Sequence, residues 1–164
     1  MTSHSYFYKT MPSPVGLLTL VANEQGLAAV LWEKDDPKRV RLSPLHEDNK
    51  HPVLLEAERQ LTDYFAGRRE KFKLKLDFTG TEFQRQVWQA LLTIPFGETR
   101  TYGQIAKRVG AAPQAVGQAC GANPLPFLIP CHRVTGTDWF GGFSAPGGVE
   151  TKAALLRHEG ALLL

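Results

Sequence analysis

Two neighbouring residues, Cys131 and His132, are of types that together carry out nucleophilic chemistry. A thiol attacks as its thiolate, and an adjacent histidine lowers the pKa of a cysteine from about 8.5 toward neutrality. A carboxylate that holds the histidine completes the arrangement found around activated nucleophiles. Neighbouring side chains of a regular strand point to opposite faces, so the pair can cooperate only where the backbone turns or a water bridges them. The sequence leaves three candidates for the carboxylate: Glu159, Asp138 and Glu150.

The competing interpretation is that the cysteines only fill space. A cysteine is among the most often buried residues, and a Cys–His dipeptide alone is a weak motif. Cys120 shares an apolar helical face with Val116 and Ala119, and we expect it to be such a packed side chain. Two cysteines cannot build a disulfide framework or a thiolate-rich zinc site, so both are expected to be reduced thiols.

Length and composition narrow the class of protein. The chain has 164 residues, 43% hydrophobic and 21% charged, as in a globular protein of one domain or two small ones. No stretch approaches the roughly 18 apolar residues of a membrane span, and the first residues do not resemble a secretory signal. We therefore expect a cytoplasmic protein without a membrane partner. The net charge of +3 permits nucleic-acid binding without requiring it.

In the first half of the chain, the patterns predict a small α/β unit. Strands at 15–22 and 27–32 flank a turn and form a hairpin, and 33–51 is mostly loop. Apolar residues recur at helical spacing over 53–66. Strict alternation of apolar and polar residues over 72–78 predicts a half-buried strand.

The second half is predicted to be mostly helical. Thr81 with Gln84, and Thr101 with Gln104, are capping-box signatures that open two helices, and Gly110 ends the second. Proline at position 113 suits the start of a further helix, which gives a helix-turn-helix. A last helix is expected over 149–158. The sequence thus indicates an α+β protein with domains at 1–80 and 81–164, each too small for a generous core alone, so we expect the two to pack together.

The segment Ile129-Pro130-Cys131-His132-Arg133-Val134 resembles the active-site signature of the O6-alkylguanine-DNA alkyltransferases, the methylated-DNA–protein-cysteine S-methyltransferases. Further segments resemble the family in the family's order: 80–88, 94–99, 101–103, 115–117, 123–124 and 155–160. The resemblance implies a ribonuclease-H-like N-terminal domain and a winged-helix, helix-turn-helix C-terminal domain.

The resemblance also implies an activity. Such a protein binds double-stranded DNA containing O6-alkylguanine through the minor groove and flips the damaged base out of the stack. The Cys131 thiolate then takes the alkyl group from O6 of guanine, with O4 of thymine as a second candidate position. The thioether is not reversed, so each molecule acts once. The implied protein is a monomer that needs no cofactor and no metal.

Roles follow by resemblance for each matching residue. Cys131 is the nucleophile, His132 is the base that takes its proton through a water, and Glu159 is the carboxylate that orients the histidine. Tyr102 donates a proton to the departing guanine and presses on the adjacent phosphate. Asn123 holds the backbone between the recognition helix and the active-site loop.

The resemblance also implies residues for DNA and for the base. Val134 reads the base edge through its backbone carbonyl, and Arg133 is mainly an internal salt-bridge partner. The expected DNA-binding residues are Gln114, Tyr102, Ala115, Gly117 and Arg133. The expected wall of the base pocket is Val134, Phe143, Ser144 and Ala145.

The chain departs from the family at two places. Gln114 stands where the family has an arginine that fills the gap left by the flipped base, and glutamine is shorter and uncharged. The loop 142–148 differs from the family's Gly-Tyr-x-Gly-Gly pattern through an insertion. Three other functions compete: a lesion sensor that binds without repair, a cysteine hydrolase, and a structural winged-helix module. In lesion sensors a tryptophan typically replaces the cysteine, which Cys131 argues against.

Overall fold

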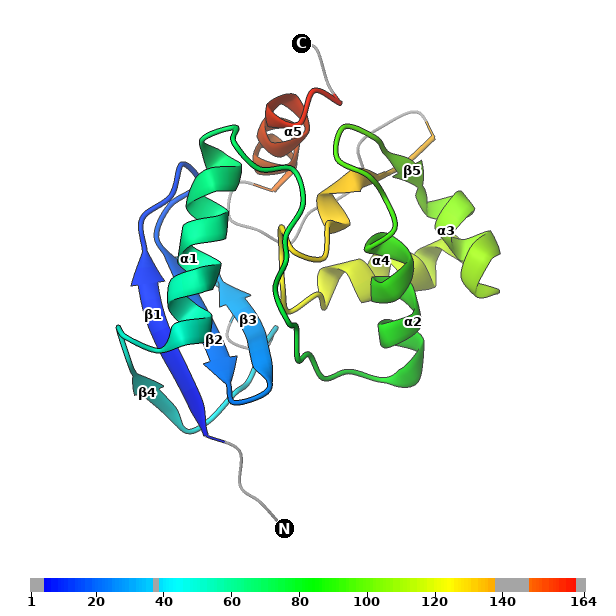
Figure 1. Ribbon diagram of the computed structural model, residues 1–164. Helices are drawn as coiled ribbons and strands as arrows, with labels where there is room; N and C mark the ends of the chain where they lie inside the picture. Colours follow the sequence, from blue (N-terminus) through cyan, green and yellow to red (C-terminus); the bar gives the residue numbers. More distant parts are fainter. Residues whose placement is uncertain (1–4, 37–38, 138–147, 162–164) are drawn as a thin grey trace. The chain divides into compact units, whose positions relative to one another are not determined.

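The computed structural model describes residues 5–36, 39–137 and 148–161. Contacts within the chain divide it into two compact units, residues 1–79 and residues 80–164. No helix in these described stretches has the length and apolarity to cross a membrane. The first unit combines a sheet with one helix, and helices dominate the second unit (Figure 1). The α+β class expected from the sequence is therefore confirmed.

The first unit is a four-stranded sheet with one helix across it (Figure 1). The strands lie in the order β3-β2-β1-β4, with β1, β2 and β3 antiparallel and β4 parallel to β1. The elements are β1 (Tyr6–Met11), β2 (Leu18–Asn23), β3 (Gly26–Leu31), β4 (Leu45–Glu47) and α1 (Pro52–Phe65). The hairpin β2–β3 and the helix confirm the elements predicted at 15–32 and 53–66.

Helix α1 contributes the apolar face that the periodicity predicted. Its buried apolar residues are Leu54, Ala57, Leu61 and Tyr64, which recur at helical spacing. The helix begins after His51, whose ring accepts a hydrogen bond from the Val53 amide. This face packs on the sheet and forms the core of the unit.

The strand predicted over 72–78 is wrong. The alternation is present, since the apolar side chains are half-buried and the lysines between them are exposed, but only one β-bridge forms, from Leu76 to Leu27. At that point the segment passes close to the end of the hairpin. A Cβ on Gly26 (φ 152°) would lie 2.5 Å from the Lys75 carbonyl oxygen. The segment is therefore extended without being a regular strand. Alternation of apolar and polar residues indicates which face of a segment is buried, and not whether a neighbouring strand pairs with it.

Two further strands, β1 and β4, were not predicted from the sequence. Strand β1 lies ahead of the predicted hairpin, and most of its side chains are half-buried without clear alternation. Strand β4 lies within 33–51, which was expected to be loop. It has only three residues, all exposed, and gains its regularity by pairing with β1. Such edge pairing leaves no periodic signal in the sequence.

The second unit contains four α-helices among its described residues. They are α2 (Glu82–Leu91), α3 (Tyr102–Val109), α4 (Pro113–Gly121) and α5 (Val149–His158). Both capping boxes are confirmed: the threonine hydroxyl accepts from the glutamine amide, and the glutamine side chain accepts from the threonine amide, at Thr81/Gln84 and at Thr101/Gln104. Each box satisfies two backbone donors and fixes where its helix starts.

Helices α3 and α4 form the predicted helix-turn-helix. Gly110 ends α3 in the left-handed conformation (φ 73°, ψ 43°), which a residue with a side chain rarely adopts. The Trp88 indole of α2 donates to the Ala119 carbonyl of α4 at 2.9 Å and ties these helices together. A parallel two-stranded ladder of β5 (Arg100–Thr101) and β6 (Val134–Thr135) then joins the start of α3 to the segment after Cys131.

Candidate active site

Cys131 and His132 lie in a single turn of 3₁₀ helix, η1 (Cys131–Arg133), between Pro130 and β6. The backbone therefore turns at this dipeptide, which is the condition that the sequence set for cooperation between the two side chains. Cys131 is 5% exposed and His132 is fully buried. Neither Cys131 nor Cys120 is in a disulfide, and Cys120 is buried on α4 as expected.

Asn123 shapes the loop that leads to the cysteine. Its buried side-chain amide donates to the Ile129 carbonyl at 2.8 Å, and its oxygen accepts from the Leu125 amide at 2.9 Å. Within this loop Phe127 has a φ of 73°, a conformation uncommon for residues other than glycine. The asparagine side chain thus adds to the loop's own backbone bond from the Ile129 amide to the Leu125 carbonyl (2.8 Å) and fixes the approach to η1.

A buried network surrounds Glu159, the residue that caps α5. One carboxylate oxygen is 2.8 Å from Nε2 of His132. Arg133 donates to both carboxylate oxygens, at 2.7 Å from Nε and 2.9 Å from Nη2, and donates to the Ile94 carbonyl at 2.7 Å. Of the three carboxylates left open by the sequence, Glu159 is therefore the one that holds the histidine. Glu150 is exposed, and Asp138 lies outside the described residues.

These contacts set the charges of the network. Burial would raise the pKa of Glu159, but the hydrogen bonds from His132 and Arg133 outweigh it and lower that pKa to about 2. Burial lowers the pKa of His132, and the bond to Glu159 opposes this only in part. The imidazole is thus neutral at pH 7 beside a charged carboxylate. Because the carboxylate only accepts, Nε2 carries the hydrogen and Nδ1 has the lone pair.

The position of that lone pair matters for chemistry. Nδ1 of His132 is buried and has no hydrogen-bond partner among the described residues. A buried nitrogen without a partner costs free energy unless another group uses it. The arrangement of His132 and Glu159 can therefore accept a proton at Nδ1, on the residue next to the thiol.

Sequence reasoning missed Lys152. Its side chain is fully buried, and its ammonium donates to the Tyr102 hydroxyl at 3.3 Å and lies 5.5 Å from the centre of that ring. Burial lowers the pKa of Lys152 to about 8, and the electrostatic effect of the nearby Cys131 and Cys120 opposes that shift. Lys152 stands four and seven residues before Leu156 and Glu159, so the helical period would have predicted that it faces inward.

Burial also raises the pKa of Tyr102 to about 12, with smaller contributions from charge on Cys120 and Cys131. The phenol therefore keeps its proton at neutral pH. A Cβ on Gly117 of α4 would lie 3.9 Å from the Tyr102 ring, so the start of α3 and the middle of α4 meet at this tyrosine.

The remaining predicted residues fall into three groups. Gln114 is exposed on the first turn of α4, and Ala115 and Gly117 beside it are half-buried. Arg133 and Val134 are buried, and the bonds of Arg133 turn inward to Glu159 and Ile94, which favours the internal role expected for Arg133. Phe143, Ser144 and Ala145 lie outside the described residues.

Fold and site together define a two-unit α+β protein. Its second unit carries a helix-turn-helix and, next to it in the chain, a buried cysteine whose neighbouring histidine is held by a glutamate. Comparison with known proteins narrows this class. Residues 82–161 match the DNA-binding domain of 6-O-methylguanine DNA methyltransferase, and residues 6–78 match its ribonuclease-like domain.

Close relatives agree with both matches. The methylated-DNA–protein-cysteine methyltransferase of Methanosarcina acetivorans is 42% identical over 94% of this chain and 99% of its own length. The constitutive enzyme of Bacillus subtilis is 40% identical over 93% and 94%. The crystal structure of Mycobacterium tuberculosis OGT in complex with DNA has a TM-score of 0.84 and 40% identity, covering 96% of this chain and 93% of the other. The chain therefore belongs to the 6-O-methylguanine DNA methyltransferase family, which confirms the resemblance seen in its sequence.

Proposed function

We propose that this protein repairs DNA directly by moving the alkyl group of O6-alkylguanine onto the sulfur of Cys131. The observation that carries the proposal is the 2.8 Å bond between His132 and Glu159, which leaves Nδ1 of the histidine as a proton acceptor on the residue next to the thiol. Family membership and the relatives' names, methylated-DNA–protein-cysteine methyltransferase, support the same chemistry.

The reaction is a single displacement. The Cys131 thiol gives its proton to Nδ1 of His132, directly or through a water, and its sulfur forms a bond to the alkyl carbon. The bond between that carbon and O6 breaks, and its electron pair goes to guanine, which takes up a proton. Cys131 becomes a thioether. Because no group in the reaction regenerates the thiol, one chain repairs one lesion. In this proposal the protein works as a monomer.

Tyr102 is the proposed proton donor to the leaving guanine. Its raised pKa keeps the proton available at neutral pH. Lys152, which donates to the same hydroxyl oxygen, leaves the phenolic hydrogen directed elsewhere and fixes the ring by its position beside it. In this proposal Lys152 is a positioning residue that acts through Tyr102.

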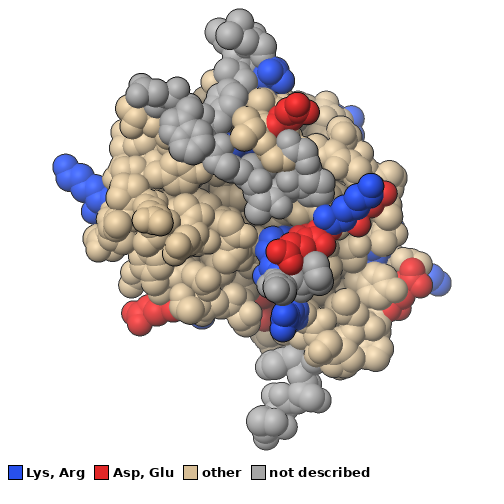
Figure 2. Space-filling model, turned by 180° about the vertical axis from the view of Figure 1, so that it is seen from behind, with Lys and Arg blue, Asp and Glu red and all other residues tan. Residues whose placement is uncertain are grey.

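DNA is the proposed macromolecular partner, through the helix-turn-helix. Residues 109–132, which contain α4 and the loop to Cys131, include no lysine, arginine, aspartate or glutamate. On the face that Figure 2 shows, basic and acidic side chains are interspersed rather than gathered by sign. We infer that α4 meets the duplex through shape and uncharged contacts, with Gln114 placed toward the gap left by the flipped base.

Intact-protein mass spectrometry tests the proposal. The protein is incubated with an excess of a duplex carrying one O6-methylguanine, and separately with the same duplex undamaged. The expected result is the mass of one methyl group added per chain with the lesion and none without it. A duplex that is bound while its lesion stays intact would instead identify a lesion sensor.

Replacing Tyr102 by phenylalanine should slow transfer without weakening DNA binding. The Tyr102→Phe side chain keeps the ring beside Gly117 and loses only the hydroxyl that Lys152 contacts. Loss of a general acid costs about 10²- to 10⁴-fold in rate. Single-turnover rates and the Kd for the lesion duplex, measured side by side, separate the two effects. An equal loss in Kd would show that the hydroxyl serves binding instead.

Replacing Gln114 by arginine should speed repair of duplex DNA by about tenfold, because a guanidinium stacks and carries charge where the glutamine amide does not. Gln118→Arg is the matched control: Gln118 is also exposed and lies one turn later on α4. Repair rates on duplex and on a single-stranded lesion are compared for both variants. Equal gains from the two arginines would mean that added charge, and not filling of the gap, limits the wild-type protein.

A further inference from the structure

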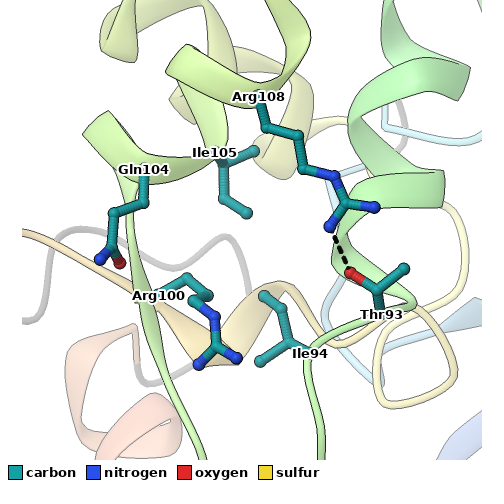
Figure 3. Close-up of a pocket in the computed structure, with 6 residues that line it drawn as sticks. All are labelled: Thr93, Ile94, Arg100, Gln104, Ile105 and Arg108. Carbon is teal, nitrogen blue, oxygen red and sulfur yellow. Dashed lines mark hydrogen bonds between the residues drawn. The ribbon is translucent and has the colours of Figure 1, made fainter.

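A cavity in the helical unit is lined by polar side chains, most of them hydrogen-bond donors, and by apolar walls. It has a volume of about 240 Å³ and opens between the end of α2, strand β5 and the outer side of α3 (Figure 3). Its lining residues are Thr93, Ile94, Arg100, Gln104, Ile105 and Arg108. Two guanidinium groups and one carboxamide stand around its mouth, and no carboxylate lines it.

The orientation of Arg108 is fixed by a relay of hydrogen bonds. The Thr93 hydroxyl donates to the Ala90 carbonyl at 2.6 Å, and its oxygen accepts from Nη1 of Arg108 at 2.7 Å (Figure 3). Arg108 forms no ion pair with any described carboxylate within 4.0 Å. Its charge therefore faces the cavity with a neutral partner only, and its other donors remain for a ligand.

Gln104 and Arg100 add donors from two other directions. The Gln104 oxygen accepts from the Thr101 amide in the capping box, which leaves its NH₂ group as the part able to reach the cavity. Arg100 pairs with Glu98 at 3.1 Å, but both side chains are exposed, at 38% and 52%. Such surface pairs contribute little, so an anion can compete for the guanidinium.

We propose that this cavity binds a phosphate group. A tetrahedral oxyanion accepts several hydrogen bonds at once, and arginine donors in a fixed arrangement match it. The cavity is larger than one phosphate, and its apolar walls, Ile94 and Ile105, suit a phosphate that carries an organic part. The same chemistry comes from the DNA backbone or from a small phosphate compound in solution. The absence of cations over residues 109–132 favours DNA, because the recognition helix then needs a phosphate anchor outside itself.

Two residues that line the cavity also contact the segment that follows Cys131. The Ile94 carbonyl accepts from Arg133, which holds Glu159, and Arg100 pairs with Val134 in the β5–β6 ladder. A phosphate bound here contacts two residues whose backbones support the site around Cys131. This site is independent of the methyl transfer itself and can be tested without a lesion.

Titration with inorganic phosphate tests the site. Backbone amide spectra of the full-length protein are followed at constant ionic strength, with chloride as the balancing anion. We expect saturable shifts at Arg100, Gln104 and Ile105. Arg108→Gln should raise the Kd at least tenfold, since a charged hydrogen bond is lost. Lys107→Gln, the same charge change at the exposed neighbour outside the cavity, should leave the Kd within twofold.

A second variant and a second probe complete the test. Thr93→Val removes only the hydroxyl that orients Arg108, and it should also raise the Kd for phosphate. This variant tests the site even where Arg108→Gln does not fold. Absence of saturable shifts, or equal effects of Arg108→Gln and Lys107→Gln, would overturn the proposal. Binding of undamaged duplex at several salt concentrations identifies the source. A slope of log K against log salt that is smaller by about 0.9 in Arg108→Gln alone assigns a DNA phosphate. An unchanged slope together with lost phosphate binding assigns a free phosphate compound.

Discussion

Replacing Cys131 by serine is expected to abolish methyl transfer while leaving binding of the lesion duplex intact. Serine keeps the size of the side chain in η1 and replaces the thiol by a hydroxyl whose proton is far harder to remove. The buried His132 that supports the thiol has a lowered pKa and is a weak base for such a proton. Loss of the nucleophile of an activated pair costs on the order of 10³-fold or more in rate.

The chain offers a matched control in its other cysteine. Cys120 is also buried and lies within electrostatic range of Cys131 and Lys152. Burial raises its pKa, with charge on Cys131 adding to the effect, so it stays a neutral thiol and a poor nucleophile. Cys120→Ala should therefore gain one methyl group at close to the wild-type rate. Peptide mapping of the wild-type product should place the methyl group on Cys131.

Two results would contradict this assignment. A methyl group found on Cys120 in the Cys131→Ser variant would mean that proximity to the lesion, and not activation by His132, selects the sulfur. Loss of lesion binding together with transfer would mean that the serine had disturbed the loop that Asn123 holds. Measuring the Kd beside the rate distinguishes the second result from loss of the nucleophile alone.

The parts of the fold that local chemistry specifies could be predicted from the sequence. The capping boxes at Thr81 and Thr101 start their helices where the threonine–glutamine spacing indicates. Gly110 ends α3 in the left-handed conformation, and Pro113 begins α4 where its fixed φ suits the first helical position. These features depend on contacts within four residues, so the sequence alone contains them.

Features that depend on distant partners could not be predicted. The segment 72–78 has the alternation of a strand but pairs at Leu76 alone. Glu159 could not be chosen over Glu150 by spacing, because the choice depends on where η1 brings His132 and Arg133. Lys152 was missed because a lysine usually indicates an exposed position, and here burial is combined with a tyrosine hydroxyl as its partner.

Replacing Glu159 by glutamine is expected to lower both the stability of the helical unit and the rate of transfer. The substitution removes the charge that compensates Arg133, which is buried and bonded to both carboxylate oxygens. Leaving one member of a buried pair without its partner costs about 3–5 kcal/mol. Urea unfolding at pH 7 should show a loss of that size. Glu150→Gln is the control, because Glu150 is exposed at the start of the same helix and should change stability by less than about 0.5 kcal/mol.

The dependence of stability on pH follows from the directions in which the pKa values of Glu159 and His132 are shifted. The pKa of Glu159 is about 2 in the folded protein against its usual value of 4.5, so its stabilisation is complete above pH 4.5 and is lost as the pH falls toward 2. His132 also has a lowered pKa, so the unfolded chain takes up its proton first as the pH falls below 6.5. The wild-type protein should therefore lose stability through both ranges. The Glu159→Gln variant should keep the loss of stability below pH 6.5 that His132 causes. It should lack the loss of stability between pH 4.5 and 2 that Glu159 causes.

A pH profile of the rate separates orientation of the histidine from simple loss of packing. The carboxylate raises the pKa of His132 against the effect of burial, so its removal should lower that pKa further. The acid limb of the single-turnover rate should then move to lower pH in Glu159→Gln, and the plateau should fall because a weaker base takes the thiol proton. A purely structural role would lower the plateau and leave the limb where it is. An unmoved limb would therefore contradict Glu159 as the residue that positions and tunes His132.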